Sequence, residues 1–192
     1  FETQATVDSP TLSEFDFELS APRVGSQQAK QALVDVVSDS IYKFRRRQFQ
    51  DLFFQDAIQE EEIDDYRKRH LNTKAIKAEV SGFLAKFDEI NICTSCYVYC
   101  LMLYKKTMNR RKKGAKNDSF ILVLKTCFFI ALKYVLDDTL VMLKDYSEHA
   151  DIEASVLEQL ELTLLTDVLK FEVNFSEKQY QEELKNIANP VC

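Results

Sequence analysis

The sequence predicts an all-α fold, and two observations lead to this prediction. The 192 residues include only three glycines and three prolines, so the chain has few of the residues on which turns, bulges and phosphate-binding loops depend. Apolar residues recur at three- and four-residue steps along most of the chain, which is the spacing of one face of an α-helix. Because hydrophobic residues make up 46% of the sequence, the chain can bury the core of one domain and carry an extension.

The amino-terminal residues differ from the rest of the chain. Residues 1–26 hold two of the three prolines and one of the three glycines, and in EFDFEL acids alternate with Phe15, Phe17 and Leu19. Such alternation is typical of extended backbone, and a segment with little apolar surface orders only when a partner covers it. We therefore predict an extended arm over residues 1–26.

Residues 27–70 are predicted to form a helical extension. Over residues 27–57 the spacing predicts one long helix or two shorter ones, which pack on the rest of the chain or on a partner. The following QEEEIDDYRKRH, residues 59–70, is a block of acids followed by a block of bases, which is typical of a solvated helix or connector. The apolar positions of the first segment are Leu33, Val36, Val37, Ile41, Phe44, Phe49, Leu52 and Phe53.

Residues 71–189 are predicted to contain five helices and a carboxy-terminal helix. Asn72 or Thr73 caps the first of them and Ser176 the last, because their side-chain oxygens accept from unpaired backbone N–H groups. The third helix is apolar almost all round, so the others are expected to enclose it. The predicted segments are 72–88, 90–108, 119–136, 142–151, 152–173 and 174–188.

Net charge limits the class of partner. A formal net charge of −6 argues against general nucleic-acid binding, which depends on an excess of Lys and Arg. The segment Lys105–Lys116 is the exception, with seven Lys or Arg in twelve positions; it is predicted to be a solvated loop or a site for RNA, acidic protein or anionic membrane. The apolar run Phe120–Leu136 carries two lysines and is short for a membrane span, so no transmembrane segment is predicted.

Cysteine usage indicates a reducing compartment. The five cysteines are an odd number, and Cys93, Cys96 and Cys100 have the spacing of one helix face rather than of a disulfide framework. Cys93 and Cys96 form a C-x-x-C, but no further ligands stand at the spacing of a zinc site, so buried thiols are predicted and no metal. We expect an intracellular location, cytoplasmic or nuclear.

Catalytic and cofactor motifs are absent from the sequence. Three glycines leave no phosphate-binding loop or dinucleotide fingerprint, and neither G-x-S-x-G nor H-E-x-x-H occurs. The acid pairs Asp64/Asp65 and Asp137/Asp138 have no basic or metal-binding companions nearby and are predicted to cap helix ends. The chain is therefore predicted to be neither an enzyme nor a cofactor-binding protein.

Lys133 interrupts the most apolar segment of the chain, CFFIALKYVLDD at residues 127–138. A buried ammonium group is costly unless it is paired or reaches water. Two interpretations follow. Either the stem packs while the charged end reaches solvent or Asp137 at i+4, or the lysine is reserved for a partner protein.

The order of these segments resembles a cyclin box. FFIALKYVLDD is similar to the third-helix pattern of that family, and MLKDYSEHADIEASVLEQLELTLLTDVLKFEVNFSEKQY is similar to its fourth and fifth helices and the exit that follows. The resemblance covers residues 73–187 and looks most like the divergent Y-type cyclins, which have a single box. It implies a five-helix box around a central third helix, with additional helices at both ends.

The resemblance also implies a function and a site. In cyclins a third-helix Lys and a fifth-helix Glu bond the backbone of the C-helix of a cyclin-dependent kinase. Lys133 stands at the Lys position, and Glu161 or Leu162 stands at the Glu position. Tyr134 and Phe171 fall where cyclins present apolar contacts. The chain is thus expected to be a non-catalytic regulatory subunit that binds and activates a cyclin-dependent-type protein kinase.

A second function stays open on the sequence. Met102 and Leu103 occupy positions where many cyclins have Asp-Arg, and a long arm precedes the box. The alternative is a cyclin-fold structural adaptor within a larger protein or nucleoprotein assembly, without kinase activation.

Overall fold

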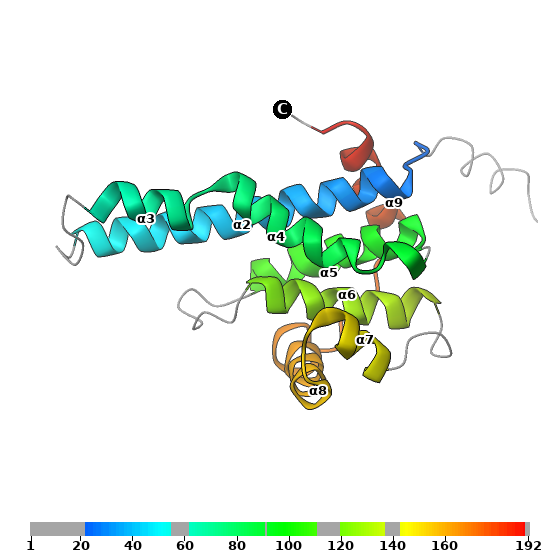
Figure 1. The fold of residues 1–192 in the computed structure, drawn as a ribbon. Coiled ribbons are helices and arrows are strands. Elements are labelled where there is room, and N and C mark those ends of the chain that lie inside the picture. The colour runs from blue at the N-terminus through cyan, green and yellow to red at the C-terminus, as the bar shows by residue number, and fades with distance from the viewer. Residues whose placement is uncertain (1–21, 55–61, 91, 111–119, 137–142, 191–192) are drawn as a thin grey trace, which may run out of the picture.

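The computed structural model describes residues 22–54, 62–90, 92–110, 120–136 and 143–190, and all regular secondary structure in these ranges is helical (Figure 1). The prediction of an all-α fold is confirmed for this part of the chain. A 3₁₀ turn, η2, covers Asp88–Ile90, and a π-helical turn, η3, covers Leu164–Val168. The α-helices are α2 (Ser26–Phe54), α3 (Ile63–His70), α4 (Thr73–Ala85), α5 (Thr94–Arg110), α6 (Phe120–Leu136), α7 (Leu143–Ala150), α8 (Ala154–Thr163) and α9 (Glu177–Ala188).

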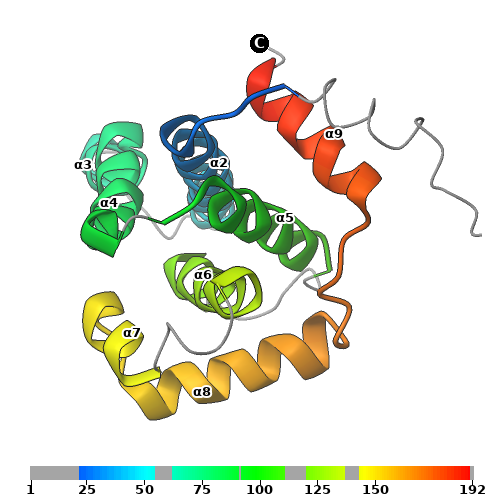
Figure 2. The same ribbon diagram turned by 90° about the vertical axis from the view of Figure 1, so that its right-hand side faces the viewer.

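Two helices, α5 and α6, lie side by side at the centre of the molecule (Figure 2). Every residue from Cys96 to Tyr104 in α5 and from Thr126 to Leu132 in α6 is buried. α6 is the helix predicted to be central; α5 joins it there because α2 and α9 pack on α5 as well. Enclosure explains the apolar run of α6, and among the described helices none is long and apolar enough to cross a membrane.

α2 is a single helix of 29 residues, and its first half belongs to the central core. The buried side chains follow three- and four-residue steps and pack mainly on α4 and α5. The first half of this predicted extension therefore shares one core with residues of the predicted box. Of the two placements predicted for this helix, the structure has the one on the chain itself. Its buried apolar residues are Ala29, Leu33, Val34, Val37, Ile41 and Phe49.

The second half of α2 projects beyond α5 and α6, with α3 beside it (Figure 1). α3 buries none of its residues, which agrees with the predicted solvated helix. Tyr66 holds it against α2, since its ring centroid lies 5.3 Å from that of Phe49. The predicted arm of residues 1–26 lies outside the described residues up to residue 21.

The predicted caps define two of the helix starts. The Asn72 side chain accepts from the backbone N–H groups of Lys74 and Ala75 and begins α4. The Ser176 hydroxyl accepts from the backbone N–H of Gln179, whose side chain in turn accepts from the backbone of Ser176, and this capping box begins α9. Both starts are set by local hydrogen bonds, which is why the sequence predicts them.

α7 and α8 cover the side of α6 that faces away from α5 (Figure 2). An aromatic cluster joins α7 and α6 to the turn that follows α4, since the ring centroid of Phe87 lies 5.2 Å from that of Phe128 and 5.2 Å from that of Tyr146. The Tyr146 hydroxyl donates to the Lys125 carbonyl, and the Lys125 ammonium donates to the Ala150 carbonyl. These contacts fix the turn from α7 into α8 and so place α8 across α6.

Candidate partner-binding site

Lys133, in the last turn of α6, forms an ion pair with Glu161 of α8. Lys133 Nζ lies 2.9 Å from Glu161 Oε1 and 5.1 Å from the centroid of the Phe129 ring. The side chains are 37% and 15% exposed, so the pair sits at the edge of the core rather than inside it. The stem of Lys133 therefore packs against the core, while its ammonium group reaches both Glu161 and solvent. Asp137, the other predicted partner, lies outside the described residues.

The position of α8 selects Glu161 rather than Leu162 as the residue beside Lys133. Leu157, one helical turn earlier, is fully buried and directs the following turn toward α6. Leu162 points outward instead, with 53% of its surface exposed. Of the two adjacent candidates, Glu161 therefore pairs with Lys133, and Leu162 presents an apolar side chain to solvent.

Three exposed apolar side chains lie on the elements of the ion pair or on the segment that follows them: Tyr134 follows Lys133 in α6, Leu162 follows Glu161 in α8, and Phe171 lies after η3. Tyr134 is 52% exposed, Leu162 is 53% exposed and Phe171 is 66% exposed. Large apolar side chains that gather on a surface are typical of protein-binding sites. We name these three residues, together with Lys133 and Glu161, the Lys133 surface.

Tyr134 is held in place although half of it faces solvent. Its ring stacks on Tyr99 of α5, with centroids 4.7 Å apart and planes 13° apart. Its hydroxyl donates to the Asn174 side chain, and the Tyr99 hydroxyl donates to the Val173 carbonyl. Burial, and then the neighbouring Tyr134, raise the pKa of Tyr99. The end of α6 and the segment after η3 are therefore joined through two tyrosines.

The segment after η3 has an unusual backbone. Lys170 and Phe171 are consecutive residues with φ of 51° and 57°, in the left-handed region that costs a non-glycine residue about 1–2 kcal/mol. The Phe171 N–H donates to the Leu165 carbonyl at 2.8 Å, and Arg110 Nη1 donates to the Leu169 carbonyl at 2.8 Å. Strained residues held by their surroundings are frequent at functional sites. Here the strained residue, Phe171, has its ring exposed to solvent, so the ring contributes little to the stability of the fold.

Cations at the start of the basic segment Lys105–Lys116 are engaged within the chain. Lys106 and Arg110 both pair with Glu172 and so brace the segment that carries Phe171. The pairing with Arg110, and to a smaller extent with Lys106, holds the pKa of Glu172 below its usual range. Residues 111–119 lie outside the described residues, so the proposed contact with RNA, acidic protein or membrane stays a prediction.

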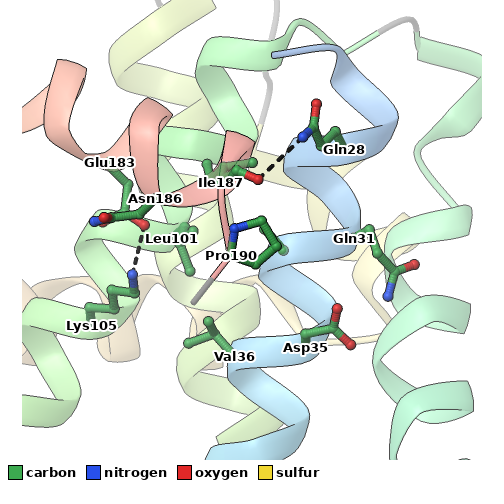
Figure 3. Close-up of a pocket in the computed structure, with 11 residues that line it drawn as sticks. Gln28, Gln31, Asp35, Val36, Leu101, Lys105, Glu183, Asn186, Ile187 and Pro190 are labelled. Carbon is green, nitrogen blue, oxygen red and sulfur yellow. Dashed lines mark hydrogen bonds and ion pairs between the residues drawn. The ribbon is translucent and has the colours of Figure 1, made fainter. Parts of the chain in front are cut away.

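A hollow of about 300 Å³ lies between α2, α5 and α9 (Figure 3). Lys105 Nζ lies 2.6 Å from Glu183 Oε1 across it, and Gln28 Nε2 donates to the Ile187 carbonyl at 3.2 Å. Leu101 forms part of its apolar wall. Because the Lys105–Glu183 pair and the Gln28 hydrogen bond cross it and no thiol, hydroxyl or imidazole lines it, we interpret it as the joint that holds α9 against α2 and α5.

The cysteines agree in part with their prediction. Cys96, Cys100 and Cys127 are buried, but Cys93 is exposed. α5 begins at Thr94, so Cys93 precedes the helix and the argument from a shared helical face does not apply to it. In the described ranges no group of three or more His, Cys, Asp or Glu side chains is placed to hold a metal ion.

Sequence reasoning missed the groups that support the Lys133 surface. Tyr99, Asn174 and the left-handed pair at Lys170 and Phe171 carry no sequence signal of their role, since neither Gly nor Asn marks the strained positions. Comparisons with family models, curated proteins and solved structures found no match.

Proposed function

We propose that this chain is a non-catalytic regulatory subunit of the cyclin type, which binds a cyclin-dependent-type protein kinase through the Lys133 surface and holds it in an active conformation. The observation that supports the proposal is the contact between Lys133 and Glu161 beside exposed Tyr134, Leu162 and Phe171. The resemblance to the cyclin box designates Lys133, Tyr134, Phe171 and either Glu161 or Leu162 without reference to the structure.

The ion pair suits a partner's backbone better than a charged side chain. The Lys133 ammonium has three N–H donors and the Glu161 carboxylate has several lone pairs, so each keeps bonding capacity after they pair at 2.9 Å. Together they carry no net charge and therefore do not attract a charge of either sign. Unpaired backbone C=O groups of a partner can accept from Lys133, and unpaired backbone N–H groups can donate to Glu161.

The apolar side chains supply the larger part of the binding free energy. Full burial of a large apolar side chain contributes about 1.5–3 kcal/mol, and Tyr134, Leu162 and Phe171 are each more than half exposed in the free chain. Tyr134 is also fixed before binding, by stacking on Tyr99, and the backbone that carries Phe171 is held in a left-handed conformation. Fixed side chains lose less conformational entropy when a partner covers them.

Affinity capture from the source cells tests the proposal. The tagged wild-type chain is compared with Lys133→Glu and with Lys144→Glu, a matched charge reversal at an exposed lysine of α7. Bound proteins are identified by mass spectrometry and tested for phosphate transfer to a protein substrate. We expect wild type and Lys144→Glu to recover an active protein kinase, and Lys133→Glu to recover at least tenfold less.

Two results would contradict the proposal. One is stoichiometric recovery of an assembly that contains no kinase, which Lys133→Glu leaves unchanged; this result would favour the structural adaptor. The other is recovery of a kinase to the same extent by Lys133→Glu and by Lys144→Glu, since binding would then use a different surface.

A further inference from the structure

Cys93 and Cys96 form a close pair of thiols at the start of α5. Their sulfur atoms are 3.4 Å apart, and the Cys96 N–H donates to the Cys93 carbonyl at 3.1 Å, which folds the intervening residues into a tight turn. A disulfide has an S–S length of about 2.05 Å, so the sulfurs need to approach each other by only about 1.4 Å. Rotation of the two side chains, without movement of the helix, brings about an approach of this size.

The two thiols differ in their access to solvent. Cys93 is exposed, whereas Cys96 is fully buried. Burial, and to a smaller extent the hydrogen bond with Cys93, raise the pKa of Cys96. A dissolved oxidant therefore meets Cys93 first, and Cys96 is in contact with Cys93 from the inner side. An exposed thiol with a neighbouring resolving thiol is the arrangement of a reversible exchange site.

We infer that Cys93 and Cys96 are a site of reversible covalent modification by small disulfides such as oxidised glutathione. In the first step the Cys93 thiolate attacks one sulfur of the small disulfide; a mixed disulfide forms and one thiolate leaves and takes up a proton. In the second step Cys96 Sγ attacks Cys93 Sγ, the Cys96 proton passes to the departing sulfur, and the second small thiol leaves. The chain loses two electrons and two protons, and the small disulfide is reduced to two thiols.

The pair lies where three helices meet, so its oxidation state acts on the joint between them. The Ser26 hydroxyl at the start of α2 donates to the Ile92 carbonyl at 3.0 Å, and the Thr94 hydroxyl lies 3.5 Å from that of Ser26. From α9, the Tyr180 hydroxyl donates to Ser95 at 3.1 Å. A disulfide within this turn restrains the residues that bond α2 and α9 to α5.

Incubation of the full chain with oxidised glutathione tests the inference. All variants carry Cys192→Ser, so four cysteines remain, and the reaction is stopped with acid before alkylation, intact-mass measurement and peptide mapping. We expect the reference chain to lose about 2 Da and to contain a Cys93–Cys96 linkage that dithiothreitol reverses. Cys96→Ser should stop at a glutathione adduct on Cys93, and Cys93→Ser should react at least tenfold more slowly because the remaining thiols are buried.

Cys100→Ser is the matched control, because it removes a buried thiol outside the pair and should still form the linkage. Far-UV circular dichroism establishes that each variant is folded, and brief labelling of the reference chain with iodoacetamide should modify Cys93 before the other three. A stable glutathione adduct on the reference chain, or preferential labelling of a cysteine other than Cys93, would overturn the inference.

Discussion

Lys133 Nζ and Glu161 Oε1 are 2.9 Å apart, and the two side chains reach this contact from the last turns of α6 and α8. The carboxylate is the more buried partner, at 15% exposed against 37% for the lysine. Loss of the lysine therefore leaves a charge that water reaches poorly, whereas loss of the carboxylate leaves an ammonium that can turn toward solvent. The two single substitutions should consequently differ in their cost.

The first prediction concerns this asymmetry. Lys133→Met should lower the free energy of unfolding by about 1–3 kcal/mol, because it leaves Glu161 without its partner. Glu161→Gln should cost about 0.5–1.5 kcal/mol, and the double variant should cost less than the sum of the two. Urea denaturation measures all three. The control is Lys43→Met, which removes the exposed pair with Asp39 and should change stability by no more than about 0.5 kcal/mol. If Lys133→Met costs no more stability than Lys43→Met, solvent already screens the pair of Lys133 and Glu161.

The second prediction separates stability from binding at Phe171. Because its φ is 57°, Phe171→Gly removes backbone strain, while the unfolded chain gains freedom; the free energy of unfolding should stay equal or rise by up to about 1 kcal/mol. Kinase recovery should fall at least tenfold, because the exposed ring is lost. Lys170→Gly is the matched control, since its φ is 51° and it carries no ring; it should retain recovery. If Phe171→Gly lowers stability by more than about 1 kcal/mol, the ring has a structural role instead.

What the sequence predicts here is mostly local. The helix starts at Asn72 and Ser176 follow from side-chain oxygens that accept from backbone N–H groups two or three residues on. Both bonding groups therefore lie within a few residues of the sequence, and the start can be predicted from them. Lys133 attracts notice because a charge within an apolar run is costly wherever the run is buried. Its partner Glu161 was one of two candidates, since one residue of helix turns a side chain by about 100°.

What the sequence does not predict depends on which surfaces meet. The apolar stripe of α2 indicates that one face is covered, but the same stripe fits a partner protein or the chain itself. Cys93 was expected inside because the helix was expected to include it, and α5 begins one residue later. The left-handed backbone at Phe171 is imposed by bonds from distant groups such as Arg110, which no local pattern encodes.

The third prediction tests whether α2 is part of the domain. Leu33 is fully buried in the core that also contains α5, so Leu33→Ala should lower the free energy of unfolding by about 2–5 kcal/mol. Far-UV circular dichroism, which reports all helices, and tyrosine fluorescence should show one shifted transition. Exposed Gln31→Ala, on the same helix, should change stability by no more than about 0.5 kcal/mol. A tyrosine transition that stays at the wild-type midpoint would mean that α2 unfolds separately.

The last prediction concerns alkaline pH. Burial raises the pKa of Cys127 to about 12 from its ordinary 9.0, and burial, followed by the charge of Asp88, raises the pKa of Tyr97 to about 12 from 10.0. In the unfolded chain these groups lose their protons at lower pH than in the folded chain. The unfolded chain therefore binds fewer protons above about pH 9, and the free energy of unfolding must fall as the pH rises from there toward 12.

Lys125, which is partly buried, acts in the opposite direction. Burial lowers the pKa of Lys125, so its unfavourable charge in the folded chain disappears as the pH rises toward 10.5, which adds stability. The buried thiols and phenols outnumber Lys125, because burial also raises the pKa values of Tyr99, Cys100 and Tyr146. Urea denaturation at intervals from pH 7.5 to 10.5 should thus give a midpoint that is level up to about pH 8.5 and then decreases.

Cys127→Ala identifies the contribution of one group to this decrease. The variant loses stability at every pH because it removes a fully buried sulfur, but its curve should be flatter between about pH 8.5 and 10, where the unfolded Cys127 thiol would titrate. Ile130→Val serves as the control, since it also removes buried volume but no titratable group; it should lower stability by about 0.5–1.5 kcal/mol and leave the slope unchanged. A midpoint that stays constant to pH 10.5 in the wild-type chain would mean that the thiols and phenols of α5 and α6 reach water in the folded state, contrary to the packing described above.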